Sequence, residues 1–174
     1  MGNADREFLA TPTSPLVDSW AVAQLDDDDR AFLAAFEPTV SLDGVLYCHA
    51  TPHSDEALFT RITPEERVRE LLEPVAERTV VCGHTHVQFD RRIGDVRVVN
   101  AGSVGMPYGT TDACWALAVD GEVELRRTVY DLEPAAERLR ASGHGMRERL
   151  IAENVLATPS AEDATEFFEA QIRD

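Results

Sequence analysis

The stretch VVCGHTHVQFD (Val80–Asp90) places two histidines, one residue apart, directly after an apolar, β-branched run and a glycine. The run that ends at Cys82 is typical of a buried strand bounded by Gly83. Because residues i and i+2 of an extended chain project to the same side, we expect His84 and His86 to reach one point in space. That geometry suits a metal ion.

A third histidine, His49, follows the apolar run VLYC in the same way. Strand ends at one edge of a sheet are common places for sites in α/β proteins, so His49 is expected to approach the pair from an adjacent strand. A lone histidine in such a position is more often a partly buried imidazole bonded to the backbone, whereas three at strand ends favour a metal site. His53 and His144 lie in polar or glycine-rich loops and are interpreted as structural, although His53 can still reach a site near His49.

At 174 residues, the chain is long enough for one domain with a sizeable core, and we expect residues 1–174 to form a single domain. No apolar run approaches the roughly 18 residues that a membrane span needs, so no membrane partner is expected. The N-terminus has no basic region followed by an apolar stretch, which favours a cytoplasmic location.

Acidic residues outnumber basic residues 32 to 16, for a formal net charge of −16, and every basic residue is arginine. Such a field repels a phosphate backbone, so no large nucleic-acid partner is expected unless a bound metal ion or a local cation patch inverts the sign. Three widely spaced cysteines, set among apolar residues, indicate buried thiols rather than a disulfide framework. They are Cys48, Cys82 and Cys114.

The N-terminal part of the chain predicts a loop and then helices. The segment from Met1 to Pro15 is rich in turn formers and shows no periodicity, which predicts a loop. Apolar residues at helical spacing then predict two short helices, the first capped by Asp18 or Ser19. The aspartate run Asp26–Asp29 is expected to be the solvated connection and N-cap region between them.

The rest of the chain predicts a sheet-rich middle and a helical end. Thr63 is the expected N-cap of a helix that has Pro64 at its first position and runs to about Glu73. Further helices are expected from Glu133 and from Ser160. Strands are expected over 40–48 as a pair turning at 43–44, and over 79–82, 88–93, 96–99, 113–119 and 123–130, with hairpin turns at 94–95 and 120–121.

Two further stretches carry polar groups suited to a site. GNAD, from Gly2 to Asp5, contains Asn3, an oxygen-ligand candidate that would by itself be interpreted as part of a turn. VNAGSVGMP, Val99–Pro107, follows a strand and combines glycines with a serine. It is either an anion-binding loop with exposed amides or a tight connection.

Taken in order, four blocks resemble the calcineurin-like metallophosphoesterases, especially their small YfcE-like phosphodiesterase branch. The blocks are GNAD from Gly2, CHATP from Cys48, GHTH from Gly83 and VNAGSVGMP from Val99. They cover nearly the entire chain in the family's order. The resemblance implies an α/β fold, an α/β/β/α sandwich of two sheets packed face to face with helices outside, and a dinuclear metal centre at the sheet edge.

The same resemblance assigns metal ligands to matching positions only. It implies that Asn3, His49 and His84 bind one metal ion and that His86 binds the other, with Asn3 and His49 also taking part in catalysis. Mixed histidine, asparagine and carboxylate ligands suit two divalent ions drawn from manganese, iron, zinc, nickel and cobalt.

Two departures from the family pattern bear on this site. Family members carry, upstream of the GNAD block, one strand ending in D-x-H and another ending in G-D, which supply the remaining ligands of the first ion and the bridging carboxylate. This sequence begins at GNAD, so we expect an N-terminally truncated form of the fold, with a dinuclear centre that is incomplete in this chain alone. Ala4 stands where many relatives have a histidine thought to assist the leaving group, which weakens a general-acid role.

The resemblance predicts a metal-dependent phosphoesterase that hydrolyses phosphodiester or phosphomonoester bonds of a small substrate through two metal ions. Asn100 and Ser103 would contact that substrate or shape their loop. The alternative is a non-catalytic metal-binding or regulatory protein that retains part of the fold. A third hypothesis is a mononuclear zinc site built from His49, His84 and His86 with water in the open position. The sequence leaves the oligomeric state open, and a homo-oligomer is compatible with it.

Overall fold

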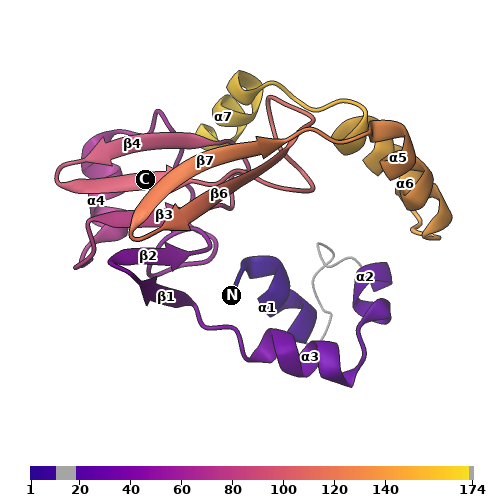
Figure 1. Ribbon diagram of the computed structural model, residues 1–174, viewed down its shortest axis with the longest axis horizontal. Helices are drawn as coiled ribbons and strands as arrows, with labels where there is room; N and C mark the ends of the chain where they lie inside the picture. Colours follow the sequence, from indigo (N-terminus) through magenta and orange to yellow (C-terminus); the bar gives the residue numbers. More distant parts are fainter. Residues whose placement is uncertain (11–18, 173–174) are drawn as a thin grey trace.

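The computed structural model describes residues 1–10 and 19–172 of the chain (Figure 1). Its centre is a five-stranded mixed sheet in the order β1-β2-β3-β5-β4, and a second sheet pairs β6 with β7. Every strand expected from the sequence is present, with bounds shifted by at most two residues. The strands are β1 (Thr39–Leu42), β2 (Val45–Cys48), β3 (Thr79–Cys82), β4 (Phe89–Ile93), β5 (Val96–Asn100), β6 (Ala113–Val119) and β7 (Glu122–Thr128).

Three of these strands, β2, β3 and β5, run parallel, while β1 and β4 pair antiparallel at the two edges. Parallel strands point the same way, so the residues that follow them meet at one edge of the sheet. These residues are His49, Gly83 and Ala101. The topology therefore gathers the blocks singled out in the sequence at the carboxyl edge.

Two hairpin turns bring the sheets together at the opposite edge. Asp43 and Gly44 join β1 to β2 with φ of 51° and 76°, and Asp120 and Gly121 join β6 to β7 with φ of 50° and 81°. Two-residue turns with both residues at positive φ match the twist of the flanking strands. A Cβ on Gly121 would lie 2.8 Å from the Asp43 carbonyl oxygen, so glycine permits this close approach of the two turns.

The central strands are buried on both faces, as expected for parallel pairing. One core cluster lies between the five-stranded sheet and α4 (Glu65–Leu72), and the other lies between the two sheets. The first includes Leu46, Val80, Val98, Val68 and Leu72, and the second consists of Val45, Val81, Val99 and Val123. Helix α4, the five-stranded sheet and β6–β7 form three successive layers, which confirms the expected α/β fold (Figure 1).

The outer face of β6–β7 remains open to solvent. Its apolar side chains Trp115, Leu117 and Val119 are 37%, 38% and 56% exposed. Each faces a polar residue across the hairpin, and the Trp115 indole N–H donates to the Thr128 hydroxyl at 3.0 Å. The described helices therefore do not form a closed fourth layer over this sheet.

The segment after Met1 is a helix, α1 (Asn3–Leu9), and the expectation of a loop was wrong there; residues 11–15 of that expected loop lie outside the described residues. The Asp5 carboxylate accepts a hydrogen bond from the Gly2 N–H at 2.8 Å, and the Arg6 N–H donates to the Gly2 carbonyl at 3.0 Å. These bonds satisfy free groups of the first turn. Seven residues are too few to show a helical period, which is why the pattern missed this helix.

The remaining helices lie where the sequence places them. Asp26 caps α3 by accepting from the Asp29 N–H at 2.8 Å, and Ser160 caps α7 by accepting from the Asp163 N–H at 3.0 Å. Asp18, an expected cap, lies outside the described residues. The helices are α2 (Ser19–Gln24), α3 (Asp27–Ala34), α5 (Leu132–Ala141), α6 (Arg147–Leu150), the π-helical turn η1 (Ile151–Val155) and α7 (Ala161–Glu169).

The start of α4 differs from the expectation. Pro64 occupies the N-cap position, so the expected role of Thr63 as the cap was wrong. Thr63 Oγ1 accepts from the Thr60 N–H at 2.8 Å and donates to the Glu169 carboxylate. A hydroxyl engaged in this way is not free for capping, and the bonds tie the loop before α4 to the C-terminal helix.

The structure also bears on membrane helices and on the state of the cysteines. Within residues 1–10 and 19–172, no helix has both the length and the apolar character that crossing a membrane requires. All three cysteines are free thiols, as expected. Cys82 and Cys114 are buried, and Cys48 is partly buried.

Leu72 tests the layer between α4 and the sheet. Its side chain is 2% exposed, so we expect Leu72→Ala to lower the free energy of unfolding by about 2–5 kcal/mol through lost burial and a residual cavity. Leu42→Ala is the matched control, because Leu42 is 59% exposed. Urea denaturation of both variants checks this, and equal effects of the two substitutions would contradict the packing described.

Candidate metal centre

His49 and His84 meet at the carboxyl edge of the sheet, directly after β2 and β3. The distance from His49 Nε2 to His84 Nδ1 is 3.2 Å. The Gly83 N–H donates to the His49 carbonyl at 2.8 Å, which continues the β2–β3 ladder past the strand ends and holds the two histidines at the same level. The structure thus brings these two predicted ligands into contact.

The second ring nitrogen of His84 defines which tautomer is present. His84 Nε2 lies 3.3 Å from the Glu56 carbonyl oxygen. A carbonyl oxygen only accepts, so Nε2 carries the hydrogen and Nδ1 of the neutral ring presents its lone pair. Metal-binding histidines are commonly held in this way, with the other nitrogen on a backbone carbonyl. The lone pair of His84 Nδ1 is therefore directed at His49 Nε2, 3.2 Å away.

The backbone through the GHTH block is not extended, so that expectation was wrong. His84 has φ of 64° and His86 has φ of 58°, both in the left-handed region. The Thr85 N–H donates to the Gly83 carbonyl at 2.7 Å, which closes a tight turn between the histidines. As a result, the two rings face different neighbours. Non-glycine residues in this region are strained and are enriched at functional sites.

Asn100, the last residue of β5, holds this turn in place. Its side-chain amide donates to the Gly83 carbonyl at 2.5 Å and to Thr85 Oγ1 at 3.1 Å. Its side chain is almost fully buried. Ser103 Oγ similarly accepts from the Met106 N–H at 3.0 Å. Of the two roles expected for Asn100 and Ser103, shaping the loop is the one that these bonds support.

His86 faces Tyr108. The two rings stack with centroids 5.8 Å apart and planes 26° from parallel. His86 forms a hydrogen bond to the Met106 backbone, while its Nδ1 is buried and has no hydrogen-bond partner in the described part of the chain. A buried nitrogen left unsatisfied costs free energy, and a bound ion would remove that cost. Tyr108 was missed in the sequence, because nothing in its spacing marks an aromatic neighbour of the histidines.

Helix α1 brings the GNAD block against His49. A Cβ on Gly2 would lie 2.9 Å from His49 Nδ1, so the imidazole occupies space that any other residue at this position would need. Asn3, the first residue of α1, is partly buried. The GNAD and CHATP blocks therefore meet in space at Gly2 and His49.

A cavity of about 230 Å³ opens beside His49 and is lined in part by Arg6, His53 and Asp55. Arg6 pairs with Asp55 at 2.7 Å and with Glu56 at 2.6 Å. Sequence reasoning missed this pairing, because it joins residues about 50 positions apart and depends on how α1 packs. His53 lines the cavity next to His49, in agreement with the possibility that it reaches the site.

The described side chains contain no group of three or more histidines, cysteines or carboxylates arranged to hold a metal ion. The three-histidine zinc site is therefore not formed. The reason is the turn at Thr85, which directs His84 to His49 and His86 to Tyr108. What is present is a pair of facing imidazoles and a third imidazole with an unsatisfied nitrogen.

Burial keeps all three imidazoles neutral. It lowers the pKa of His49 from 6.5 to about 4, and the neighbouring His84 acts in the same direction. Burial also lowers the pKa of His84 and of His86. Neutral imidazole is the form that binds metal ions, so the three rings are ready to act as ligands at neutral pH.

The lowered pKa values predict how stability depends on pH. Between pH 6.5 and about 4, His49 is protonated in the unfolded chain and neutral in the folded one, so stability is lost as the pH falls through this window. Urea denaturation with a chelator at about pH 7.5 and about pH 5 should show a lower free energy of unfolding at the lower pH. The fall should be smaller in His49→Asn, and an equal fall in both proteins would contradict the assignment.

Comparisons with known proteins agree with this geometry. The family model for the calcineurin-like phosphoesterase superfamily domain matches residues 1–122. A metallophosphoesterase from Sphaerobacter thermophilus is similar in structure, with a TM-score of 0.70 and 19% identity, over 86% of this chain and 72% of that chain. A hypothetical protein from Pyrococcus horikoshii has a TM-score of 0.70 and 16% identity, over 87% of this chain and 69% of that chain. No curated protein matches the sequence.

The family match extends over more than half of the chain. It contains α1, the five-stranded sheet and the loops that carry the candidate ligands Asn3, His49, His84 and His86. The solved structures share the same arrangement of sheets and helices at low sequence identity. The chain belongs to the calcineurin-like phosphoesterase superfamily.

Proposed function

We propose that this chain is a metal-dependent phosphoesterase that hydrolyses phosphodiester or phosphomonoester bonds of small substrates. Metal-dependent phosphoester hydrolysis is what the family match implies. The observation that carries the proposal is the 3.2 Å separation of His49 Nε2 and His84 Nδ1. Two imidazole nitrogens bound at about 2.0–2.1 Å to one tetrahedral ion lie about 3.4 Å apart, so the pair fits a shared metal ion.

The residues at the carboxyl edge divide into two sets of ligands. In the proposed site, Asn3, His49 and His84 hold one ion, and His86, with its unsatisfied Nδ1, holds a second. Nitrogen and amide-oxygen donors suit manganese, iron, zinc, nickel or cobalt. A bound divalent ion supplies Lewis acidity toward a phosphoryl oxygen and lowers the pKa of water.

The chain's own groups position these ligands. The Glu56 carbonyl fixes the His84 tautomer, and the Asn100 amide fixes the turn between His84 and His86. His49, which lines the open cavity, and Asn3, at the start of α1, are the residues proposed to act on the substrate. The cavity of about 230 Å³ is smaller than a typical ligand pocket, which restricts the proposed substrate to a small phosphoester. A small substrate also agrees with an acidic protein that repels large nucleic acids.

A dinuclear centre also needs a bridging carboxylate. Asp5 and Asp55 are the carboxylates that act on the charge of His49. Both are engaged, Asp5 with the Gly2 N–H and Asp55 with Arg6. We therefore propose that the second ion requires a carboxylate donor other than Asp5 and Asp55.

The engagement of both Asp5 and Asp55, the carboxylates of the described residues that act on His49, favours a second candidate function. In that case, the chain binds one metal ion through Asn3, His49 and His84 without turnover, as a metal-binding or regulatory protein. Wild-type protein that takes up about one equivalent of metal and shows no hydrolysis of bis-p-nitrophenyl phosphate would favour this function over the phosphoesterase.

His49 and His84 provide the direct test of the proposed enzyme. His49→Ala and His84→Ala should each remove a metal ligand and lower kcat/KM for bis-p-nitrophenyl phosphate by about 100-fold or more. Metal content measured on the purified variants should fall in parallel. His53→Ala is the control, because His53 lines the same cavity and is not a proposed ligand. Unchanged metal content in His84→Ala would overturn the proposed ligand set.

Gly2 tests whether the position of His49 matters. Gly2→Ala places a methyl group 2.9 Å from His49 Nδ1, so the imidazole must move, and metal affinity should fall by about 10- to 100-fold. Gly145→Ala is the matched control, because nothing lies within 4 Å of its new Cβ. Titration with Mn²⁺ measures both affinities, and wild-type affinity in Gly2→Ala would show that α1 does not set the site.

A further inference from the structure

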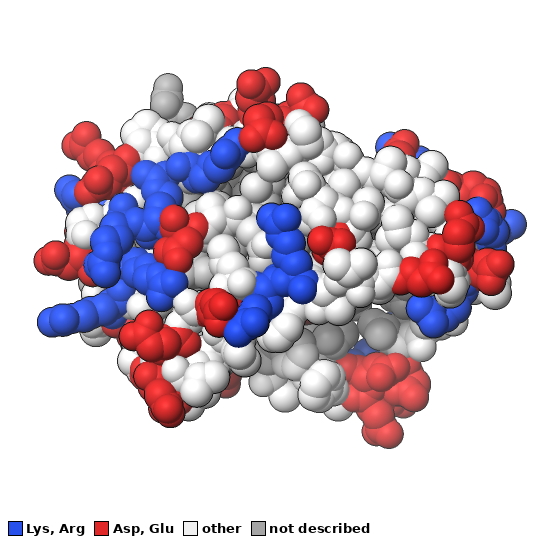
Figure 2. Space-filling model, turned by 45° about the horizontal axis from the view of Figure 1, so that its top comes forward, with Lys and Arg blue, Asp and Glu red and all other residues white. Residues whose placement is uncertain are grey.

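Arginines gather at one end of this acidic molecule. Although the net charge is −16, Figure 2 shows blue side chains concentrated at the left, the end where Figure 1 places the turn between β4 and β5. The histidines lie after the carboxyl ends of β2 and β3, whereas this turn lies at the amino edge of the same sheet. The arginine-rich end is therefore separate from the proposed metal centre.

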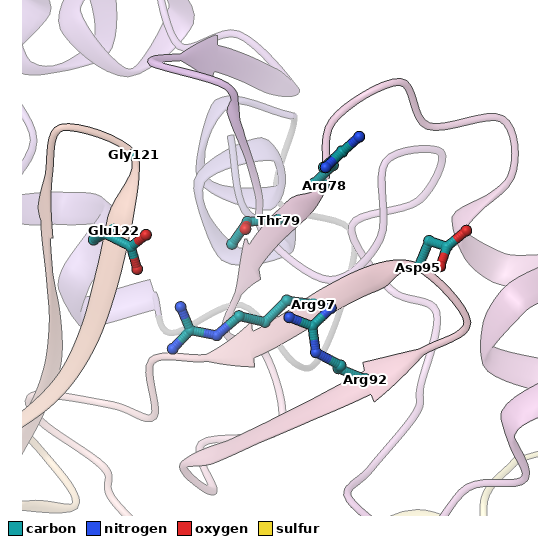
Figure 3. Close-up of a pocket in the computed structure, with 7 residues that line it drawn as sticks. All are labelled: Arg78, Thr79, Arg92, Asp95, Arg97, Gly121 and Glu122. Atoms are coloured by element: carbon teal, nitrogen blue, oxygen red, sulfur yellow. The ribbon is translucent and has the colours of Figure 1, made fainter.

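A cavity of about 460 Å³ opens at this end and contains three arginines, Arg78, Arg92 and Arg97 (Figure 3). Arg78 and Thr79 lie at the start of β3, and Arg92 and Arg97 lie on β4 and β5. The turn between β6 and β7, at Gly121, forms the opposite wall. A volume of this size is typical of pockets for small molecules.

The strand register places Arg92 and Arg97 on the same face of the sheet. Arg92 is directly opposite Arg97 in the antiparallel pairing of β4 with β5, and Figure 3 shows Arg92 beside the stem of Arg97, whose guanidinium extends toward Glu122. Like charges directly opposite on neighbouring strands are destabilising. An anion bound between the two strands would offset this repulsion.

Only one of the three arginines is compensated by the protein. Arg97 pairs with Asp90 at 2.7 Å, donates to the Val123 carbonyl at 2.8 Å and has Glu122 as a further negative neighbour. Arg78 and Arg92 have no side-chain hydrogen bond or ion pair within residues 1–10 and 19–172.

The remaining carboxylate of the lining, Asp95, does not offset this excess. Figure 3 shows its carboxylate turned away from Arg92 and Arg97. Arg78 and Arg92, both exposed, are therefore left on the lining of this cavity without a side-chain partner among the described residues. Low-dielectric walls focus such a field and raise the local concentration of anions.

We propose that this arginine pocket binds a phosphoryl group, either as free orthophosphate or as part of a small organic phosphate. The charge that Arg78 and Arg92 leave uncompensated matches a phosphoryl dianion better than a single carboxylate. Guanidinium groups donate two parallel hydrogen bonds to phosphate oxygens, which gives strength and orientation. The site is independent of the proposed phosphoesterase centre, because it uses no histidine and no metal ion.

Titration of chelator-treated protein with inorganic phosphate tests the proposal, with binding followed by calorimetry. We expect saturable binding to wild type that Arg92→Gln and Arg78→Gln each weaken by about tenfold or more. Arg126→Gln is the matched control, because Arg126 lies on the outer face of β7 and pairs with Glu124. It should bind phosphate like wild type. His84→Ala should also bind like wild type, which separates this site from the metal centre.

Thermal unfolding distinguishes ligand binding from a structural role of Arg92. Without phosphate, Arg92→Gln should be at least as stable as wild type, since Arg92 has no side-chain partner within residues 1–10 and 19–172 and lies directly opposite Arg97. With phosphate, the Tm of wild type should rise and that of Arg92→Gln should not. A lower Tm of Arg92→Gln without phosphate, or an equal rise in both, would overturn the proposal.

Glycerol phosphate and orthophosphate identify the source of the phosphoryl group. Tighter binding of glycerol phosphate assigns the pocket to an organic phosphate, and tighter or equal binding of orthophosphate assigns it to the free anion. If neither compound binds wild type saturably below about 20 mM, or if Arg92→Gln binds both as well as wild type, the pocket is not a phosphoryl site.

Discussion

The parallel pairing of β2, β3 and β5 is the constraint on which the rest of the structure depends. Its hydrogen-bond ladder continues past the strands, because the Gly83 N–H donates to the His49 carbonyl and the Ala101 N–H donates to the Cys82 carbonyl, both at 2.8 Å. These bonds use backbone groups alone. They align the loops that follow β2, β3 and β5 at the carboxyl edge of the sheet, without any contribution from side chains. Burial of both sheet faces resists a slip in register, and the imidazoles of His49 and His84 therefore meet.

The carboxyl edge of the sheet also stabilises the turn of the GHTH block. Two non-glycine residues at positive φ, His84 and His86, cost on the order of 1–3 kcal/mol each. The buried Asn100 amide spans the turn through Gly83 and Thr85, and each such bond contributes about 1 kcal/mol. Packing of Tyr108 on His86 adds a further contact. The ring orientations are consequently held by the protein itself, which lowers the ordering cost of binding a ligand.

The strands and the site blocks were predictable from sequence, whereas the local geometry was not. Apolar runs and glycine turns indicate burial and backbone preference, which are local properties of the sequence. The strands of both sheets were therefore predicted. The helix from Asn3 was missed because it is too short to show an apolar period in the sequence. A single capping contact and packing stabilise it. The left-handed histidines depend on Asn100, a residue 14 to 16 positions away, and the Arg6–Asp55 pair depends on where α1 lies. Such effects arise only once the chain is folded.

The carboxyl and amino edges of the five-stranded sheet differ in the source of positive charge available to bind an anion. With a net charge of −16, the protein repels anions beyond contact range, and salt screens that field over about 8 Å at physiological ionic strength. At the carboxyl edge, the imidazoles are neutral and Arg6 is matched by Asp55 and Glu56. In the proposed function, a phosphoester there meets positive charge only through bound metal. At the amino edge, Arg78 and Arg92 carry that charge permanently, so anion binding at this end needs no metal ion.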